Sequence, residues 1–255
     1  MHEADMPIIS VITVCLNAAA TIRQTIESVI RQNYENIEYI IIDGESTDET
    51  LILVGNYKEH INHITSEKDS GIYDAMNKGI DMAKGDILYF LNADDTLVDS
   101  EVFHRVANVF SNDPEVSLVY GDVIWRTGKE NILSKQPDRI TREFLARRTL
   151  LHQSAFMKRE LFKEIGNYDI RFRVVADYKW FLEYFLRYGG RYQYISKPIA
   201  FVGVDGVSSS TDWETERLQV MSGIFSPWEI IRYRVAPQLV RWLRKVIKSA
   251  RGDKL

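Results

Sequence analysis

Two adjacent carboxylates follow an apolar run in the first half of the chain, in the stretch Asn92-Ala93-Asp94-Asp95. Like charges this close repel each other unless a cation or a hydrogen-bond donor lies between them. A magnesium or manganese ion prefers hard oxygen ligands and is often shared between carboxylates and substrate phosphates. A second interpretation is that Asp94 or Asp95 caps a helix beginning near Asp99, because Asp is favoured in turns and at helix starts. The stretch alone leaves both interpretations open.

Two more acidic turns occur earlier in the chain. Asp43-Gly44-Glu45-Ser46-Thr47-Asp48 follows an apolar run, and Glu67-Lys68-Asp69-Ser70-Gly71 follows the next predicted strand. Carboxylates accept hydrogen bonds, so such turns can bind the ring N–H of uracil or the hydroxyls of a ribose. The three turns together favour a metal and a nucleotide over a helix cap. A dinucleotide site of the dehydrogenase type is not expected, because Asn17-Ala18-Ala19-Ala20 stands where that site needs a glycine-rich turn.

The elements that must position these turns are alternating strands and helices. Nearly continuous apolar and β-branched runs at residues 8–16, 37–42 and 87–91 are typical of strands buried on both faces. Apolar residues at helical spacing predict two helices between these strands. The buried face of the first consists of Ile22, Ile26, Val29 and Ile30, and that of the second consists of Ile72, Met76, Ile80 and Ala83. The second helix is expected to end at Gly85. This order predicts an α/β fold with a mainly parallel central sheet flanked by helices, whose ligands bind beyond the carboxyl ends of the strands.

The second half of the chain is less regular. We expect a strand at 116–120, a hairpin at 122–134, a helix at about 176–187 ended by Gly189-Gly190, and strands at 192–195 and 199–202. We therefore divide the chain into a catalytic domain at 1–210 and a tail at 211–255. The domain has a nucleotide-binding half at 1–110 and an acceptor or catalytic half at 111–210. The tail interleaves Arg and Lys with Trp, Leu, Ile and Val, which predicts a basic amphipathic helix, or two separated by Pro237.

Composition narrows the classes of protein that fit. The 255 residues are 45% hydrophobic and 27% charged, which is typical of a globular protein with a sizeable core. The net charge of −4 gives no general attraction for nucleic acid, so we expect no nucleic-acid partner. The single Cys15 cannot form an internal disulfide, and the acidic N-terminus lacks the basic and apolar regions of a signal peptide, so we expect a cytoplasmic location.

Together these motifs resemble the family 2 inverting glycosyltransferases, which have a nucleotide-diphospho-sugar transferase fold. The resemblance covers about residues 8–209 and rests on the first apolar run, on the turns after residues 42 and 91, and on the run Asp69-Ser70-Gly71-Ile72-Tyr73-Asp74-Ala75-Met76-Asn77-Lys78-Gly79. The chain departs from many relatives at two positions. Asn92 stands where an acid is common, and Met76 stands where an Arg is frequent.

The resemblance implies roles for the acidic turns. Asp43 is expected to recognise the base, and Asp94 to lie near the ribose and the metal. Asp95 is expected to coordinate the Mg²⁺ or Mn²⁺ ion that bridges the diphosphate. Asp69 and Asn77 are predicted to belong to the same nucleotide-sugar-binding site.

A catalytic base is also implied, and we predict that it is Asp177, in the segment Val174-Val175-Ala176-Asp177-Tyr178-Lys179-Trp180. A hydroxyl is a poor nucleophile, so a positioned carboxylate must take its proton as it attacks the anomeric carbon, and a single displacement inverts that carbon. Without the resemblance, Asp177 is a charge in the first turn of a helix, stabilised by the helix dipole.

Two further segments belong to the resemblance. His152-Gln153-Ser154 lies close to the sugar and acceptor in relatives, so His152 is predicted to contact the nucleotide-sugar; the alternative is a histidine hydrogen-bonded within the structure. Asp205-Gly206-Val207-Ser208-Ser209 resembles a loop that follows the catalytic domain in this family and closes over the bound donor.

The predicted function is transfer of a hexosyl or N-acetylhexosaminyl group from a UDP-linked donor to a hydroxyl of a glycan or of a polyprenyl-diphosphate-linked acceptor. A nucleotidyltransferase needs a glycine-rich basic loop that this sequence lacks. A non-catalytic nucleotide-sugar-binding protein or membrane adaptor of the same fold is the alternative. The tail has the pattern of a helix that binds an anionic membrane surface, which predicts a peripheral position at the inner face of the cell membrane; packing on protein is the other interpretation.

Overall fold

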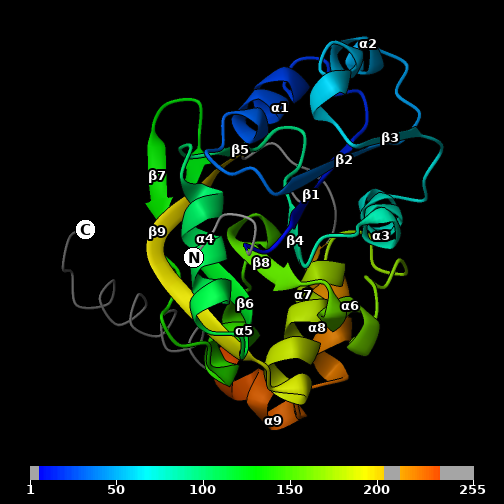
Figure 1. The fold of residues 1–255 in the computed structure, drawn as a ribbon. Coiled ribbons are helices and arrows are strands. Elements are labelled where there is room, and N and C mark those ends of the chain that lie inside the picture. Colours follow the sequence, from blue (N-terminus) through cyan, green and yellow to red (C-terminus); the bar gives the residue numbers. More distant parts are fainter. Residues whose placement is uncertain (1–5, 204–212, 236–255) are drawn as a thin grey trace.

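A computed structural model describes residues 6–203 and 213–235 of the chain. Helices lie on both faces of one nine-stranded sheet, as Figure 1 shows, so the predicted α/β fold is confirmed. The strand order is β3-β2-β1-β4-β8-β6-β9-β5, with β7 paired to β6. The strands are β1 (Ile9–Cys15), β2 (Ile37–Asp43), β3 (His63–Ser66), β4 (Ile87–Phe90), β5 (Thr96–Leu97), β6 (Val116–Arg126), β7 (Asn131–Ser134), β8 (Ala155–Lys158) and β9 (Arg191–Gly203).

The first four strands form the parallel half of the sheet, as their apolar runs predict. Each of β1, β2 and β4 is almost wholly buried, because helices cover both of its faces. The parallel register pairs Cys15 with Asp43 and Asp43 with Ser66, so the strands end at a common edge. The acidic turns that follow β2, β3 and β4 therefore leave the sheet side by side.

Two hydrophobic clusters separate the faces of the sheet. Helices α1 (Ile22–Ile30), α2 (Thr50–Gly55) and α4 (Val102–Asn112) bury their apolar stripes in one cluster. Helices α3 (Ile72–Met82), α5 (Arg142–Arg147), α6 (Glu160–Glu164) and α7 (Ala176–Glu183) bury theirs in the other. Residues of β1 alternate between the two, with Val11 in the first and Ile12 in the second, as a strand with two buried faces requires.

The second half of the chain completes the sheet with both parallel and antiparallel pairs. Strand β8 runs antiparallel to β4 and to β6, whereas β6 and β9 are parallel. The two short strands predicted at 192–195 and 199–202 are one continuous strand, β9, which absorbs the irregularity as a register shift against β6. The predicted helix at 176–187 is α7 followed by a π-helical turn, η4 (Tyr184–Tyr188), and it ends at Gly189, whose φ of 73° lies in the left-handed region.

Gly85 does not end the second predicted helix. Helix α3 stops at Met82, and Gly85 instead lies where the chain passes close to β1. A Cβ atom at this position would lie 2.5 Å from Ser10 Oγ and 2.7 Å from the carbonyl oxygen of Ile8. Glycine at this position therefore allows two backbone segments to approach closely, rather than ending the helix.

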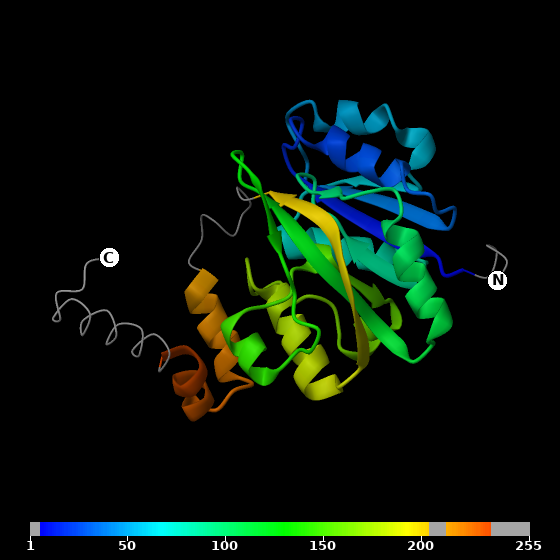
Figure 2. The same cartoon turned by 90° about the vertical axis from the view of Figure 1, so that its left-hand side faces the viewer.

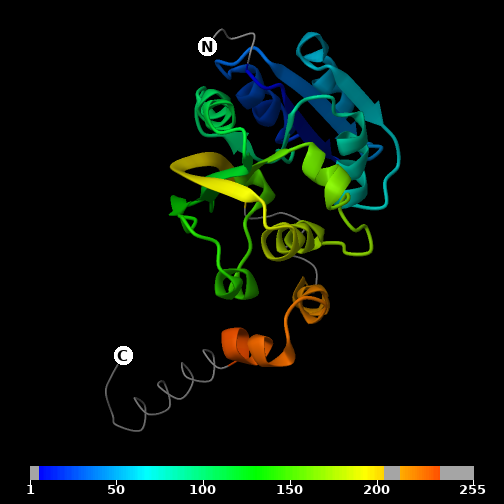
Figure 3. The same cartoon turned by 60° about the horizontal axis from the view of Figure 1, so that its bottom comes forward.

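The C-terminal described elements pack below α7, remote from α1 and α2 (Figures 2 and 3). They are α8 (Trp213–Ser222), α9 (Pro227–Ile230) and the π-helical turn η6 (Ile231–Val235). Ser226 and Glu229 form a capping box at the start of α9. Most of the predicted basic helix, and the predicted loop at 205–209, lie outside the described residues. Within the described part of the chain, no helix is both long and apolar enough to cross a membrane.

Candidate active site

Asp43 ends β2 and is fully buried. Its carboxylate accepts hydrogen bonds from the Ser46 backbone N–H at 2.9 Å, the Ser46 hydroxyl at 2.5 Å and the Ser66 hydroxyl at 2.7 Å. Burial raises the pKa of Asp43, but the hydrogen bonds from Ser46 and Ser66 outweigh burial and leave the pKa below its ordinary value. Asp43 is therefore an ionised carboxylate that shapes the turn after β2.

Two contacts join the neighbouring loops to this turn. The loop after β1 is tied to it through Asn17, whose N–H donates to Ser46 Oγ at 2.8 Å and whose Oδ1 accepts from the Thr47 N–H at 2.9 Å. The turn after β3 meets it at Gly44, where a Cβ atom would lie 2.4 Å from Asp69 Oδ2. Asp69 is thus brought against the backbone of the turn that follows Asp43, as the sheet edge predicts.

In the turn after β4, Asp95 faces inward. It is 1% exposed, and its carboxylate accepts hydrogen bonds from Gln153 Nε2 at 2.9 Å and from the Gly203 N–H at 3.0 Å. Thr25 of α1 donates its hydroxyl to the backbone carbonyls of Ala93 and Asp95, at 2.9 and 2.7 Å. Burial, and then the neighbouring Asp94 charge, raise the pKa of Asp95 to about 7. The turn is thus anchored by three separate elements.

Asp94 is placed differently from its neighbour. Its side chain is half-buried, and within residues 6–203 and 213–235 no group donates a hydrogen bond to its carboxylate. Gly203 lies beside it, so closely that a Cβ atom there would be 3.0 Å from Asp94 Oδ2. Neither carboxylate caps the following helix, because α4 begins at Val102 and Asp99 accepts the Glu101 N–H at 2.9 Å. The helix-cap interpretation is wrong.

Asp177 lies in the first turn of α7, at the centre of a buried hydrogen-bond network. Its Oδ1 accepts from the Tyr73 hydroxyl and from the Tyr178 N–H, at 2.8 and 2.7 Å. Its Oδ2 lies 3.0 Å from Nδ1 of His152. Asp177 and His152 are each 8% exposed. Asp177 is therefore a helix-start charge, and it is also held by α3 and by the segment that contains His152.

The short 3-10 helix η3 (His152–Ser154) joins this network to the acidic edge. His152 faces Asp177 through Nδ1, and its Nε2 lies 3.4 Å from Asn92 Oδ1. The next residue, Gln153, donates to Asp95. Two consecutive side chains thus connect the turn after β4 to Asp177. The interpretation that His152 is hydrogen-bonded within the structure is confirmed, and its predicted contact with the nucleotide-sugar stays a prediction.

Asn77 uses its amide within the chain. Its Nδ2 donates to the Tyr168 carbonyl at 2.8 Å, and its Oδ1 accepts from the Tyr168 N–H at 2.9 Å. This pair of bonds holds α3 against the segment that precedes α7. The predicted contact between Asn77 and a nucleotide-sugar stays a prediction, and the described geometry gives the residue a scaffold role.

The donor set at the acidic edge suits a metal that is shared with a substrate. Within the described residues, no three His, Cys, Asp or Glu side chains form a group able to hold a metal ion by themselves. Among the described residues, nothing donates a hydrogen bond to the carboxylate of Asp94, a hard oxygen ligand, whereas both oxygens of Asp95 already accept one. Mg²⁺ commonly takes one or two carboxylates and completes its coordination with phosphate oxygens and water. The residues present fit such an ion, with Asp94 as the better placed ligand.

Three residues of the network carried no assigned role in the sequence. Tyr73 and Gln153 stand inside motifs, and the signal for them is their place next to the acidic turn and to His152. Gly203 carried no signal, because its contacts with Asp94 and Asp95 depend on the pairing of β9 with β5 and β6.

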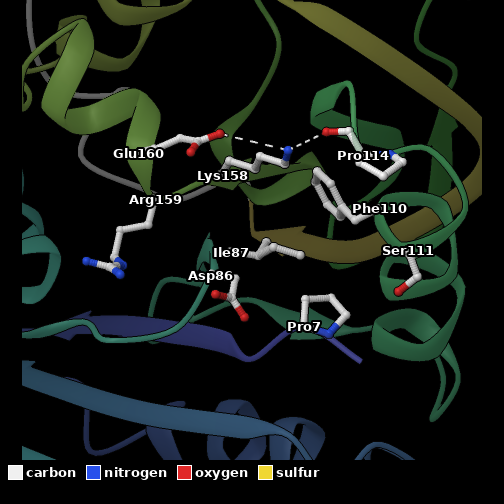
Figure 4. Close-up of a pocket in the computed structure, with 9 residues that line it drawn as sticks. All are labelled: Pro7, Asp86, Ile87, Phe110, Ser111, Pro114, Lys158, Arg159 and Glu160. Atoms are coloured by element: carbon white, nitrogen blue, oxygen red, sulfur yellow. Dashed lines mark hydrogen bonds and ion pairs between the residues drawn. The ribbon is translucent and has the colours of Figure 1, made fainter. Parts of the chain in front are cut away.

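A hollow of about 430 Å³ lies at the opposite edge of the sheet, near the amino ends of β1 and β4 (Figure 4). Its polar groups are already paired within the chain. Lys158 donates to the Pro114 carbonyl at 2.6 Å, Arg159 donates to the Gly85 carbonyl at 2.7 Å, and Asp86 accepts the Ile8 N–H at 2.9 Å. The hollow lies away from the acidic edge, and these three side chains are engaged within the chain.

Comparison with known proteins assigns the family. Residues 10–173 match the sequence profile of Glycosyl transferase family 2. A PGL/p-HBAD biosynthesis glycosyltransferase of Mycobacterium tuberculosis is 38% identical over 181 residues, which cover 68% of this chain and 67% of that protein. The chain belongs to glycosyl transferase family 2. It is therefore a glycosyltransferase, and the matched segment contains all three acidic turns and His152 but ends before Asp177.

Solved structures show the same fold at low sequence identity. Staphylococcus aureus TarS, in complex with UDP-GlcNAc, has a TM-score of 0.72 and 18% identity, over 89% of this chain and 67% of that one. The mannosyltransferase PcManGT of Pyrobaculum calidifontis, in complex with GDP-Man and Mn²⁺, has a TM-score of 0.64 and 20% identity, over 86% of this chain and 63% of that one. The fold is thus that of nucleotide-sugar transferases.

Proposed function

We propose that this glycosyltransferase moves a sugar from a UDP-linked donor to an acceptor hydroxyl in a single displacement that inverts the anomeric carbon. The observation that carries the proposal is the bridge made by η3. Gln153 bonds Asp95 of the acidic edge, and His152 faces Asp177. In this proposal, η3 links the acidic edge that binds the nucleotide to the carboxylate that accepts the proton.

Asp177 acts as the base in this proposal. Its Oδ1 accepts two hydrogen bonds from the chain, whereas Oδ2 faces only His152 among the described residues, so Oδ2 takes the proton. The acceptor oxygen forms a bond to the anomeric carbon as the bond to the diphosphate oxygen breaks, and the nucleoside diphosphate leaves with the electron pair. His152 and Tyr73 hold the carboxylate in one orientation, which lowers the cost of reaching the reactive geometry.

The donor would lie along the acidic edge, with Asp43, Asp69 and Asp94 at the base, ribose and diphosphate. Support for UDP comes from the fold that the chain shares with the UDP-GlcNAc complex. Every oxygen of Asp43 already has a donor within the chain, so direct contact with the base requires the exchange of one of these bonds. We propose that Asp43 acts first by fixing the turn that receives the base.

We assign the metal, Mg²⁺ or Mn²⁺, to Asp94, and give Asp95 the task of holding the turn. A bound divalent ion would neutralise charge on the departing diphosphate. The PcManGT complex, which contains Mn²⁺ and shares the fold, supports a divalent metal in this proposal. Direct coordination by Asp95, the residue that the sequence resemblance favours, would have to use the remaining lone pair of an oxygen that already accepts a bond from Gln153 or Gly203.

The acceptor that we propose is a glycan or a polyprenyl-diphosphate-linked oligosaccharide at an anionic membrane surface. Trp228 is 79% exposed and Ile231 is 46% exposed on the α9–η6 segment, next to the exposed Arg232. An exposed aromatic ring beside basic residues is typical of helices that lie in a membrane interface. The full chain should therefore co-sediment with phosphatidylglycerol vesicles. The substitution Trp228→Ala should reduce this binding. The control Ile52→Ala, which changes an exposed apolar residue on the remote α2, should leave it unchanged.

The experiment for the proposed reaction is a screen of nucleotide-sugars with the purified chain. UDP-N-acetylglucosamine, UDP-glucose and GDP-mannose are each tested with Mn²⁺, with Mg²⁺ and with a chelator, against a panel of sugar glycosides, alcohols and phenols. Binding is read as a rise in melting temperature, and turnover as release of the nucleoside diphosphate. We expect a UDP-sugar to bind and to turn over in a metal-dependent manner. Turnover with GDP-mannose alone would overturn the UDP assignment, and turnover unaffected by the chelator would overturn the metal.

A further inference from the structure

Helix α8 contacts the segment that carries Asp177 at two points. The Glu216 carboxylate accepts the backbone N–H of Arg173 at 2.9 Å and that of Val174 at 3.0 Å. One residue further along α8, the Arg217 guanidinium lies over the Tyr178 ring, 4.6 Å from its centroid. The helix thus holds the chain on both sides of Asp177, just before α7 begins and just after the carboxylate.

Val174 is where the contact from α8 meets the hydrogen-bond network of Asp177. Its N–H donates to Glu216, and its carbonyl accepts from the Tyr73 hydroxyl at 2.8 Å. The same Tyr73 hydroxyl lies 2.8 Å from Asp177 Oδ1. A displacement of residue 174 therefore moves an acceptor that competes for the proton of Tyr73, and changes how firmly Asp177 is held.

The structure assigns Glu216 as a positioning residue for Asp177, acting through the backbone at residues 173 and 174. The assignment deepens the proposed function and rests on Asp177 as its base. Two adjacent N–H groups ahead of a helix are donors that the helix itself does not satisfy, and a carboxylate that accepts both fixes their direction. Glu216 lies beyond residue 173, where the family match ends, so the C-terminal region of the chain takes part in holding the base.

The first test is steady-state turnover of UDP-N-acetylglucosamine with Mn²⁺ by the full chain. Glu216→Ala removes both acceptors and should lower kcat by roughly tenfold to a hundredfold, because small displacements of a reacting group cost this much, while the KM for the donor stays near its wild-type value. The kcat of Glu216→Gln should lie between those of the wild type and Glu216→Ala, because the amide oxygen can accept from one N–H while the amide nitrogen presents a donor to the other.

Glu214→Gln is the matched control. Glu214 lies on the same helix, but it pairs with Arg234 of η6, and the N–H groups of residues 173 and 174 donate to Glu216 instead. The variant should keep the wild-type kcat. An equal loss of kcat in Glu214→Gln and Glu216→Ala would overturn the assignment. A lower melting temperature of Glu216→Ala together with weaker donor binding would also overturn it, because α8 would then act only on general stability.

Hydrogen exchange tests the same contact without turnover. The amides at residues 173 and 174 should exchange faster in Glu216→Ala than in the wild type or in Glu214→Gln, and unchanged exchange would overturn the assignment. The two proposals fail in different ways. Full activity of Asp177→Asn would overturn Asp177 as the base, whereas an inactive Asp177→Asn with a fully active Glu216→Ala would overturn only the role of Glu216.

Discussion

The acidic edge in the first half of the chain and the network around Asp177 in the second half use buried carboxylates in different ways. At the edge, Asp43 and Asp95 accept hydrogen bonds that hold the turns to which they belong and to which substrate would bind. In the network, Asp177 is held by side chains from α3 and η3, which are far from it in the sequence. Asp43 is held largely within its own turn, whereas Asp95, like Asp177, is held by residues that are distant in the sequence.

This difference separates carboxylates that support the site from those available to a ligand. Asp94 and Asp95 are adjacent, yet Asp95 is buried with both oxygens bonded, and Asp94 is half-buried without such a bond in the described residues. A pair of acids in a motif therefore need not share one role. Their partners decide which one shapes the turn and which one meets the substrate.

The largest effect should come from the network. Asp177→Asn keeps the size of the side chain but removes the proton acceptor, so kcat should fall by about a thousandfold, as for the loss of a general base. Donor affinity should change little, because the donor is assigned to the other region. Glu183→Gln, on the same helix and bonded only to Arg187 among the described residues, is the control and should stay active. Activity of Asp177→Asn within a few fold of wild type would remove Asp177 as the base.

The acidic edge gives the next effect. Asp94→Asn should lower metal-dependent turnover by on the order of a hundredfold, because a charged ligand of the ion that faces the diphosphate is lost. Asp95→Asn should lower it by about tenfold, the low end of the cost expected of a residue that only supports a ligand. Manganese titrations of turnover in both variants make the comparison. If Asp95→Asn were the more damaging change, Asp95 would be the metal ligand and the division between the two acids would be wrong.

Tyr73 tests how far the network depends on α3. Tyr73→Phe removes the hydroxyl that faces both Asp177 and the Val174 carbonyl, and it keeps the aromatic ring. Unfolding free energy should fall by about 1 kcal/mol, the usual contribution of one buried hydrogen bond, and kcat should fall by less than in Asp177→Asn. Urea unfolding and steady-state kinetics measure the two effects. A stability loss with an unchanged kcat would show that Tyr73 does not orient the base.

Separate from these changes in activity is a pH dependence of stability that belongs to Asp95. Its pKa is raised to about 7 in the folded chain, so between about pH 4 and that value the folded state binds a proton that the unfolded state has lost. The free energy of unfolding of the wild type should therefore fall relative to Asp95→Asn as pH rises through this window, and the difference should level off above it. Urea unfolding of both proteins across the window measures this. A difference independent of pH would place the pKa of Asp95 near its ordinary value.

Much of the edge could be predicted from the sequence. The strands β1, β2 and β4 can be recognised in the sequence as apolar runs, because both of their faces are buried. Acidic turns directly follow β2 and β4. Parallel pairing then places the ends of neighbouring strands together. That is why the position of Asp43, Asp69 and Asp94 on one edge followed from short-range patterns alone.

The network could be predicted only in part. Asp177 and His152 were singled out, but the contact of Asp177 with Tyr73 joins residues 104 apart in the sequence, and no periodic pattern reports such a pairing. The same holds for Asn77, whose amide meets the backbone of Tyr168, 91 residues away. The inward position of Asp95 depends on Gln153 and Gly203, so it followed from packing of the second half of the chain against the first.

The anomeric configuration of the product tests the central claim most directly. With an α-linked UDP-sugar and an accepted acceptor, the configuration of the new glycosidic bond is examined by proton NMR. A single displacement with Asp177 as base predicts a β-linked product. An α-linked product would contradict the account. Retention of the anomeric configuration cannot come from a single displacement in which Asp177 acts as the base.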